Sequence, residues 1–178
     1  MNLPNKITIS RLILIPVFIL LFYFLETAGK KWYLAGLFLI MALTDLLDGM
    51  VARKTKTVTR MGALLDPIAD KLISLTIIIF YIGNGIPAWM AFLLLGRDIT
   101  ILALRSFATE WKIDILVSWW GKTKTAIEMA AFLLIILEFS IGTWILGIAL
   151  ILSIISGLDY VKKGIKMLKK KKVLKKIS

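Results

Sequence analysis

Long apolar stretches alternate with short polar or glycine-containing breaks along the whole chain. Breaking this pattern at glycine, proline and charge clusters predicts six helices, at residues 7–25, 32–53, 62–82, 86–108, 119–139 and 141–165. Each is long enough to cross a hydrocarbon core of about 30 Å at a rise of about 1.5 Å per residue. We therefore expect an all-α membrane protein with six transmembrane helices, forming a single domain over residues 1–178.

Basic residues predict the orientation of these helices. The connections ETAGKK, GNGIP and SIGT carry only Lys30 and Lys31, whereas the other basic residues fall near the opposite helix ends. By the positive-inside rule, both termini and the loops 53–61 and 109–118 are cytoplasmic. The tryptophans agree, since interfacial tryptophans mark the two membrane surfaces. Three fall at the predicted outer ends and three at the inner ends: Trp32, Trp89 and Trp144, and Trp111, Trp119 and Trp120.

The composition supports a membrane protein and excludes several chemistries. Of the 178 residues, 59% are hydrophobic, and the chain contains no cysteine and no histidine. Disulfides, iron–sulfur clusters, thiolate nucleophiles and zinc sites built on Cys or His are therefore excluded. Acid–base or metal chemistry must come from carboxylates, lysines, tyrosines or hydroxyls.

The N-terminal apolar run is expected to be a membrane span and not a cleaved signal peptide. Arg11 interrupts the run, and no small-residue cleavage site follows it. The preceding PNKITISR indicates a short N-terminal interfacial segment, with Pro4 and Asn5 starting a helix.

The C-terminus is strongly basic: nine of the 23 Lys and Arg residues fall within the last 17 residues. Two interpretations of the tail at 166–178 remain open, a solvated, frayed helix end and a polybasic segment held to anionic lipid. The second would contribute ~1 kcal/mol per basic residue. We expect no nucleic-acid partner, because no RNA- or DNA-binding motif accompanies the charge.

Four aspartates lie close together in the stretch DLLDGMVARKTKTVTRMGALLDPIAD. Asp45 and Asp48 share a face at the end of the second predicted helix, and Asp66 and Asp70 share a face at the start of the third. Because the connection is short, we expect the two helices to be antiparallel neighbours whose aspartates converge. Clustered carboxylates without Cys or His suit hard cations such as Mg²⁺, Mn²⁺ or Ca²⁺.

An alternative is a set of structural ion pairs, in which Arg53 and Lys71 neutralise part of the acidic charge. The small residues beside the aspartates weigh against it. Glycine within a helix costs up to ~1 kcal/mol relative to alanine, and it is tolerated where another group must approach closely. Gly49, Ala52 and Gly62 therefore indicate an acidic wall open to a phosphate-bearing ligand bridged by metal.

The pattern Asp45-x2-Asp48-Gly49-x2-Ala52-Arg53-x8-Gly62-x3-Asp66-x3-Asp70 resembles the signature of the CDP-alcohol phosphatidyltransferases, with every fixed position present. Three further stretches look most like the bacterial phosphatidylglycerophosphate synthases within this family: MNLPNKITISR, GRDITILALR and GKTKT. One position departs from that likeness, since Asp98 stands where we expect Glu.

The resemblance implies transfer of a phosphatidyl group from CDP-diacylglycerol to an alcohol, with release of CMP, at the cytoplasmic face of a bacterial inner membrane. It also implies a homodimer surrounded by membrane lipids. Two divalent cations, Mg²⁺ or Mn²⁺, would be held by the four aspartates. Asp45, Asp48 and Asp66 would ligate one cation, and Asp45, Asp66 and Asp70 the other. Asp70 would also be the general base. The implied CDP-binding residues are Asn5, Thr8, Asp48, Gly49, Ala52, Arg53 and Gly62.

The basic residues of the fourth and fifth predicted helices bear on the acceptor. Arg97 and Arg105 lie near one helix face, and Lys122 and Lys124 lie at the start of the next helix. Each alone is equally well explained as an interfacial anchor. Together they favour a phosphate-bearing acceptor. sn-Glycerol 3-phosphate fits, inositol phosphate would fit the same charges, and serine would not need so many cations.

Two functions of other classes compete with the enzyme. A cation transporter would place its carboxylates near the bilayer midplane in broken helices, whereas these aspartates fall at predicted helix ends. A structural membrane scaffold would tolerate, and be stabilised by, Asp66→Asn or Asp70→Asn.

Overall fold

A computed structural model of the protein describes residues 3–55, 60–110 and 119–177, and its regular structure over these ranges is helical. Side chains are described there except at 3–9, 11, 45–55, 60–67, 70, 105, 108–110, 119–122, 163 and 166–177. The helices are α1 (Leu3–Phe24), α2 (Lys30–Thr55), α3 (Arg60–Tyr81), α4 (Ala88–Glu110), α5 (Trp119–Ile136) and α6 (Ile141–Ile177).

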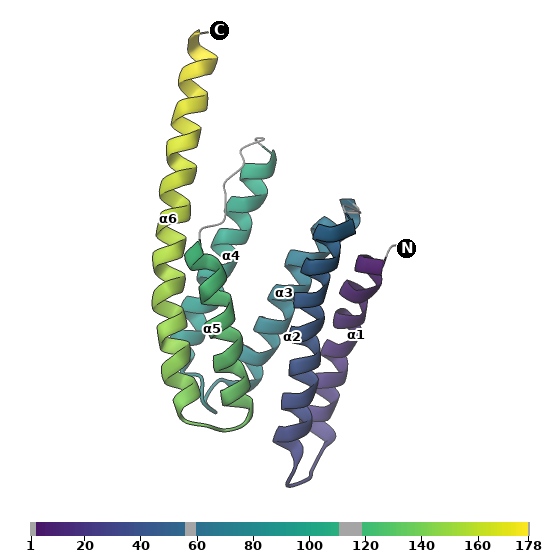
Figure 1. Ribbon diagram of the computed structural model, residues 1–178. Coiled ribbons are helices and arrows are strands. Elements are labelled where there is room, and N and C mark those ends of the chain that lie inside the picture. The colour runs from purple at the N-terminus through teal and green to yellow at the C-terminus, as the bar shows by residue number, and fades with distance from the viewer. Residues whose placement is uncertain (1–2, 56–59, 111–118, 178) are drawn as a thin grey trace.

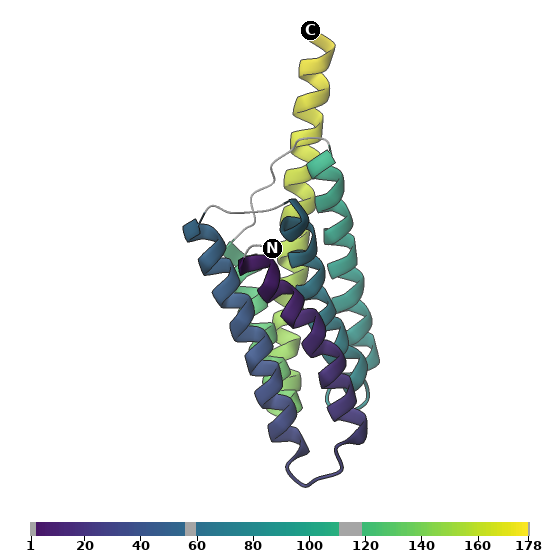
Figure 2. The same cartoon turned by 90° about the vertical axis from the view of Figure 1, so that its right-hand side faces the viewer.

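The six helices run alternately up and down and fall into two groups (Figure 1). In the first, α1 packs against both α2 and α3; in the second, α6 packs against α4 and α5. Contacts of α2 with α5, and of α3 with α4 and α5, join the two groups. Both chain termini lie at the same end, and α6 extends beyond the other helices there (Figures 1 and 2).

The predicted helices are all present, and three of their ends differ by three residues or more. The first helix, predicted to begin at residue 7, begins at Leu3 and includes the expected N-terminal interfacial segment with Pro4 and Asn5. At the other end of the chain, α6 continues to Ile177 and includes the basic tail, as expected for lysine-rich sequence with good helix propensity. α5 stops at Ile136, before the predicted 139, because Glu138 takes a left-handed conformation with φ of 65°.

Apolar side chains from all six helices fill the space between them. Phe38 of α2 and Phe132 of α5 meet edge to face across the two groups, with ring centroids 6.4 Å apart and an interplanar angle of 84°. This geometry is favourable for aromatic pairs. Other fully buried side chains are Phe18, Leu34, Met41, Ile77, Ile78, Leu94 and Ile136. The aromatic pair and its neighbours join the two helix groups into one core.

The turn from α5 into α6 is closely packed. A Cβ atom on Gly142 would lie 2.8 Å from Ile135 Cγ1 and 2.9 Å from the Ile135 backbone nitrogen. Thr143, the next residue, donates a 2.6 Å hydrogen bond to the carbonyl oxygen of Gly85 in the α3–α4 connection. Gly85 itself has φ of 104°, which favours glycine. These contacts tie two connections together at one end of the bundle.

Gly142→Ala is expected to destabilise the protein by about 1–3 kcal/mol, because the new methyl group would collide with backbone that has no room to move. Thermal unfolding in detergent measures the effect. Gly36→Ala is the matched control, since a Cβ there meets nothing within 4 Å. It should leave stability unchanged or raise it by up to about 1 kcal/mol through helix propensity. An equal or higher melting temperature for Gly142→Ala than for Gly36→Ala contradicts the close contact.

Only part of the predicted membrane topology can be read from length and apolarity. Among the described residues, one helical segment is long and apolar enough to cross a membrane, Ile141–Lys162, with shorter apolar segments at Leu12–Phe24 and Lys71–Tyr81. The other helices carry charged residues within their predicted spans.

Candidate active site

The four aspartates lie on two helices that follow each other in the chain. Asp45 and Asp48 belong to the second half of α2, and Asp66 and Asp70 to the first half of α3. The end of α2 and the start of α3 lie at the same end of the bundle (Figures 1 and 2). Their side chains lie outside the described part of the structure, so the convergence of the carboxylates stays a prediction from helix periodicity.

The relation between α2 and α3 differs from the sequence prediction in one respect. The helices are antiparallel, as expected, but over the described residues α2 and α3 are not among the pairs in extensive backbone contact. Instead α1 packs against each of them. This places the start of α1, with Asn5 and Thr8, at the aspartate end of the bundle.

The remaining predicted nucleotide residues lie on these same helices. Gly49, Ala52 and Arg53 belong to α2, and Gly62 to α3. The structure therefore assigns a helix and an end of the bundle to each predicted CDP-binding residue. Their contacts fall outside the described side chains.

Asp98 of α4, itself buried, is the centre of a group of charged side chains. Its Oδ1 accepts a 2.9 Å hydrogen bond from Arg97 and lies 3.4 Å from the Lys124 ammonium of α5. Its Oδ2 accepts a hydrogen bond from Lys71 of α3. The Asp98 side chain is only 8% exposed. One carboxylate thus holds cations from three helices.

Lys124 has a second carboxylate partner on its own helix. Its Nζ lies 2.6 Å from Oε2 of Glu128, one turn further along α5, and both side chains are 2% exposed. Arg97 is also held twice, because its Nε donates a 3.0 Å hydrogen bond to the backbone carbonyl of Ser153 in α6. We call Lys71, Arg97, Asp98, Lys124 and Glu128 the Asp98 cluster. With the Ser153 contact it connects α3, α4, α5 and α6.

The Asp98 cluster contains three cations and two carboxylates, which leaves one positive charge in excess when all five are ionised. Buried charges are costly unless they are paired or used for binding. The excess cation is chemically suited to an anionic ligand, and charge-assisted hydrogen bonds from Lys and Arg are the usual means of binding phosphate. Lys71 directly follows Asp70 in the chain. The cluster therefore begins one residue from Asp70, but on a neighbouring face of α3, about 100° around the helix.

The structure brings together two of the four residues predicted to bind the acceptor phosphate. Arg97 and Lys124 both contact Asp98, whereas the side chains of Arg105 and Lys122 lie outside the described residues. For Lys124 the alternative of an interfacial anchor is wrong, because its side chain is buried.

Sequence reasoning missed that Lys71, Asp98 and Glu128 join this group. In the sequence, Lys71 stands out only as a neutraliser of the aspartates, and Asp98 only as a departure from the family pattern. One local signal was available for Glu128: it follows Lys124 by four residues in an otherwise apolar helix, and that spacing places the pair on one face.

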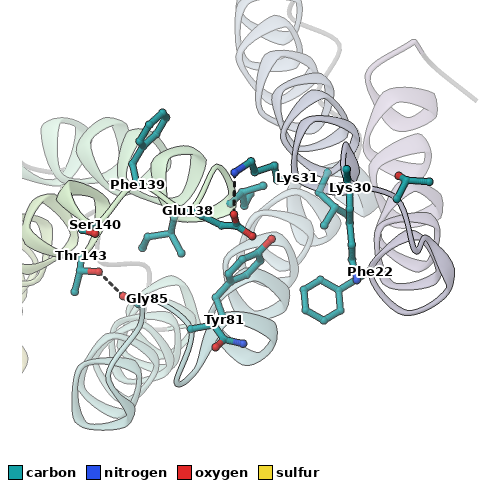
Figure 3. A pocket seen from close by; sticks show the side chains of 15 residues that line it. Phe22, Lys30, Lys31, Tyr81, Gly85, Glu138, Phe139, Ser140 and Thr143 are labelled. Carbon is teal, nitrogen blue, oxygen red and sulfur yellow. Dashed lines mark hydrogen bonds and ion pairs between the residues drawn. The ribbon is translucent and has the colours of Figure 1, made fainter.

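A separate pocket of about 730 Å³ lies at the opposite end of the bundle, where the α1–α2, α3–α4 and α5–α6 connections meet (Figure 3). Phe22, Tyr81 and Phe139 contribute to its apolar walls. Lys31 reaches across from α2 to an ion pair of 2.9 Å with Glu138. The four motif aspartates belong to the end of α2 and the start of α3, at the other end of the bundle. We therefore do not assign the predicted chemistry to this pocket.

The sequence matches the CDP-alcohol phosphatidyltransferase family over residues 1–155. The chain belongs to this family. The match includes every aspartate of the motif and the whole Asp98 cluster, and it ends before the basic tail at 166–178. The family resemblance stated from the motif is thus confirmed, and with it the class of enzyme, a phospholipid-synthesising transferase.

Similar proteins from several bacteria carry one name, CDP-diacylglycerol–glycerol-3-phosphate 3-phosphatidyltransferase. The chain is 38% identical to the Rickettsia felis protein over 171 residues, which cover 90% of this chain and 94% of that protein. It is 40% identical to the Haemophilus influenzae protein over 135 residues, which cover 73% of this chain and 72% of that protein. For the protein of Shigella flexneri serotype 5b the identity is 36% over 155 residues, covering 84% of each chain.

Divalent-metal dependence is general in the CDP-alcohol phosphatidyltransferase family. Among the side chains that the structure describes, no group of three or more Asp, Glu, His or Cys residues forms a metal site. The four motif aspartates fall outside those side chains. The four motif aspartates therefore stay the predicted metal ligands.

Proposed function

We propose that this chain transfers the phosphatidyl group of CDP-diacylglycerol to sn-glycerol 3-phosphate, giving phosphatidylglycerophosphate and CMP. Family membership and the shared name of its bacterial relatives support the reaction. The structural observation that carries the proposal is the convergence of Lys71, Arg97 and Lys124 on Asp98. One of these cations, Lys71, belongs to α3, the helix that also carries Asp66 and Asp70.

The proposed reaction is a single displacement at phosphorus. The acceptor hydroxyl oxygen forms a bond to the phosphorus that carries the diacylglycerol, and the bond from this phosphorus to the bridging pyrophosphate oxygen breaks. CMP leaves with that oxygen. Asp70 takes the proton of the acceptor hydroxyl, as expected of a carboxylate base in a chain without histidine.

Asp45, Asp48, Asp66 and Asp70 are proposed to hold Mg²⁺ or Mn²⁺, in a pair of sites. Their chemistry fits these ions, because an all-oxygen carboxylate set suits hard cations. Their placement also fits, since the end of α2 and the start of α3 lie at one end of the bundle. Bound divalent cations neutralise charge on the pyrophosphate and on the leaving CMP.

Small and polar residues around these aspartates are proposed to hold the CDP moiety. Gly49, Ala52 and Gly62 leave room for a flat group, because they have little or no side chain. Arg53 is a phosphate ligand, and Asp48 serves the nucleotide as well as the metal. Asn5 and Thr8 approach from α1, which packs on both aspartate-bearing helices.

The acceptor phosphate is proposed to bind at the Asp98 cluster through Arg97 and Lys124, with Arg105 and Lys122 on the same two helices as further ligands. Arg97 is fixed by Asp98 and by the Ser153 carbonyl, so little freedom of this side chain is lost on binding. Since Lys71 of the cluster follows Asp70, a phosphate bound there would hold the rest of the acceptor near the proposed base.

The chain is proposed to cross a bacterial inner membrane six times, with its active site and both termini on the cytoplasmic side. Its distribution of polarity supports this arrangement. Large apolar side chains face outward, for example Phe92 at 75% and Ile99 at 66% exposure, whereas Asp98, Lys124 and Glu128 are buried. Exposed apolar surface of this kind suits lipid contact. The tryptophans at the predicted outer helix ends, Trp32, Trp89 and Trp144, are also exposed. The family resemblance further supports the proposal of a homodimer.

Among possible acceptors, glycerol 3-phosphate should give the fastest CMP release from CDP-diacylglycerol and Mg²⁺. Serine should be at least about tenfold slower at equal concentration, because it has no phosphate for Arg97 and Lys124. The measurement is CMP formation by purified protein with glycerol 3-phosphate, inositol phosphate or serine. If CMP release were faster with inositol phosphate, the acceptor would be inositol phosphate instead of glycerol 3-phosphate, and the reaction would still be the phosphatidyl transfer typical of the family. Release with serine alone would contradict the phosphate site.

A further inference from the structure

Glu128 is a buried carboxylate for which the proposed reaction has no direct use. Its side chain is 2% exposed, and Oε2 lies 2.6 Å from the Lys124 ammonium. The other oxygen, Oε1, is buried and has no hydrogen-bond partner among the side chains that the structure describes. An unsatisfied buried carboxylate oxygen is costly, and its retention calls for a role.

The position of Lys124 is decided more by Glu128 than by Asp98. Lys124 Nζ lies 2.6 Å from Glu128 but 3.4 Å from Asp98 Oδ1. That same Oδ1 accepts the shorter hydrogen bond from Arg97, and the other oxygen of Asp98 is used by Lys71. Asp98 therefore has stronger partners than Lys124, and it would hold this long, flexible side chain only loosely.

We propose that Glu128 is a positioning residue of the acceptor site, which keeps the Lys124 ammonium in place to bind the acceptor phosphate. This inference rests on the proposed function. An ammonium has three N–H donors, and the two carboxylates engage two of them. The third is available for a phosphate oxygen, provided that Glu128 prevents the side chain from turning away.

Two effects of Glu128 on a bound phosphate oppose each other. Its negative charge repels the phosphate, and its contact with Lys124 maintains a cation that attracts it. Glu128 contacts the Lys124 ammonium directly, at 2.6 Å, whereas a phosphate bound on the other side of the ammonium would lie farther from Glu128, and Coulomb energies fall with distance. The effect through Lys124 is therefore the larger one, and removal of Glu128 should weaken acceptor binding.

The test compares Glu128→Gln with Glu128→Leu in the full-length protein. Glutamine keeps an oxygen that accepts a hydrogen bond from Lys124, whereas leucine fills similar space without one. Glu128→Leu should raise the KM for glycerol 3-phosphate about tenfold or more, with the KM for CDP-diacylglycerol within about twofold of the starting value. Glu128→Gln should raise the KM for glycerol 3-phosphate much less than Glu128→Leu does. Thr76→Val is the control, because the Thr76 hydroxyl is buried but bonds only to Leu72 of its own helix.

A second comparison tests whether Glu128 acts through Lys124. In a Lys124→Met background, Glu128→Leu should cause no further increase in the KM for glycerol 3-phosphate, since the ammonium is already gone. This pair also replaces two buried charges together, which makes it the variant least prone to misfolding.

Three results would overturn the proposal. A lower KM for glycerol 3-phosphate in both Glu128 variants would mean that repulsion dominates. If Glu128→Leu lowered kcat and the melting temperature and raised the KM for CDP-diacylglycerol as much as the KM for glycerol 3-phosphate, the role of Glu128 would be structural only. An additive effect in the Lys124→Met background would mean that Glu128 does not act through Lys124. If the unmodified protein released no CMP with glycerol 3-phosphate, the proposed function itself would fail.

Discussion

Asp70→Asn is expected to lower kcat by roughly 10²–10⁴-fold, because the amide cannot take the proton of the acceptor hydroxyl. CDP-diacylglycerol should still bind, since Asp45, Asp48 and Asp66 remain as metal ligands. The measurements are CMP release under saturating substrates and binding of CDP-diacylglycerol by the purified variant with Mg²⁺. Loss of turnover with retained binding is the expected pattern.

Glu26→Gln is the matched control for this prediction. It makes the same change from carboxylate to amide at an exposed position in the α1–α2 connection, at the end of the bundle opposite to the aspartates. Its turnover should equal that of the unmodified protein. Full activity in Asp70→Asn would reject Asp70 as the base, and loss of CDP-diacylglycerol binding would mean that its main role is metal ligation.

Asp98→Asn is expected to cost about 3–5 kcal/mol of folding free energy, because removing one partner of a buried ion pair leaves the other charges uncompensated. Asp98 holds Arg97 and Lys124, whose side chains are 18% and 2% exposed. Its third partner, Lys71, is 39% exposed and adds less. The same variant should also bind glycerol 3-phosphate weakly, since the basic side chains lose their common anchor. Thermal or denaturant unfolding in detergent measures the stability.

The chain offers an exposed ion pair for comparison. Lys31 and Glu138 also join different parts of the bundle, at 2.9 Å, but their side chains are 36% and 68% exposed. Glu138→Gln should therefore cost no more than about 1 kcal/mol. Equal losses in the two variants would show that burial adds nothing to the Asp98 interactions, and the account of the cluster would be wrong.

Most of the helical architecture was predictable, since long apolar runs interrupted by glycine, proline and charge mark the helices. The helix ends that were predicted wrongly depend on local backbone conformation, which the pattern of apolar residues does not encode. Glu138 ends α5 early because it adopts a left-handed conformation, which is uncommon for a residue with a side chain. α6 extends through the tail because lysine favours helix even where the sequence is no longer apolar.

The candidate site was predictable where its residues are close in sequence. The aspartate motif spans residues 45–70 on two successive helices, so helix periodicity pairs Asp45 with Asp48 and Asp66 with Asp70, while the convergence of the two pairs stays a prediction. The Asp98 cluster joins residues that are 26 and 27 positions apart on three helices. Its formation depends on how α3, α4 and α5 pack, and a single sequence does not specify that packing. Only the Lys124–Glu128 pair, four residues apart on one helix, carried a local signal.

The central claim is phosphatidyl transfer to glycerol 3-phosphate. It is tested most directly by giving the purified protein CDP-diacylglycerol, Mg²⁺ and glycerol 3-phosphate labelled in its carbon chain. The account predicts that label enters the lipid phase in equimolar amount with the CMP released, and that EDTA stops both. Release of CMP without labelled lipid, or no release of CMP with active lipid substrate present, would contradict it.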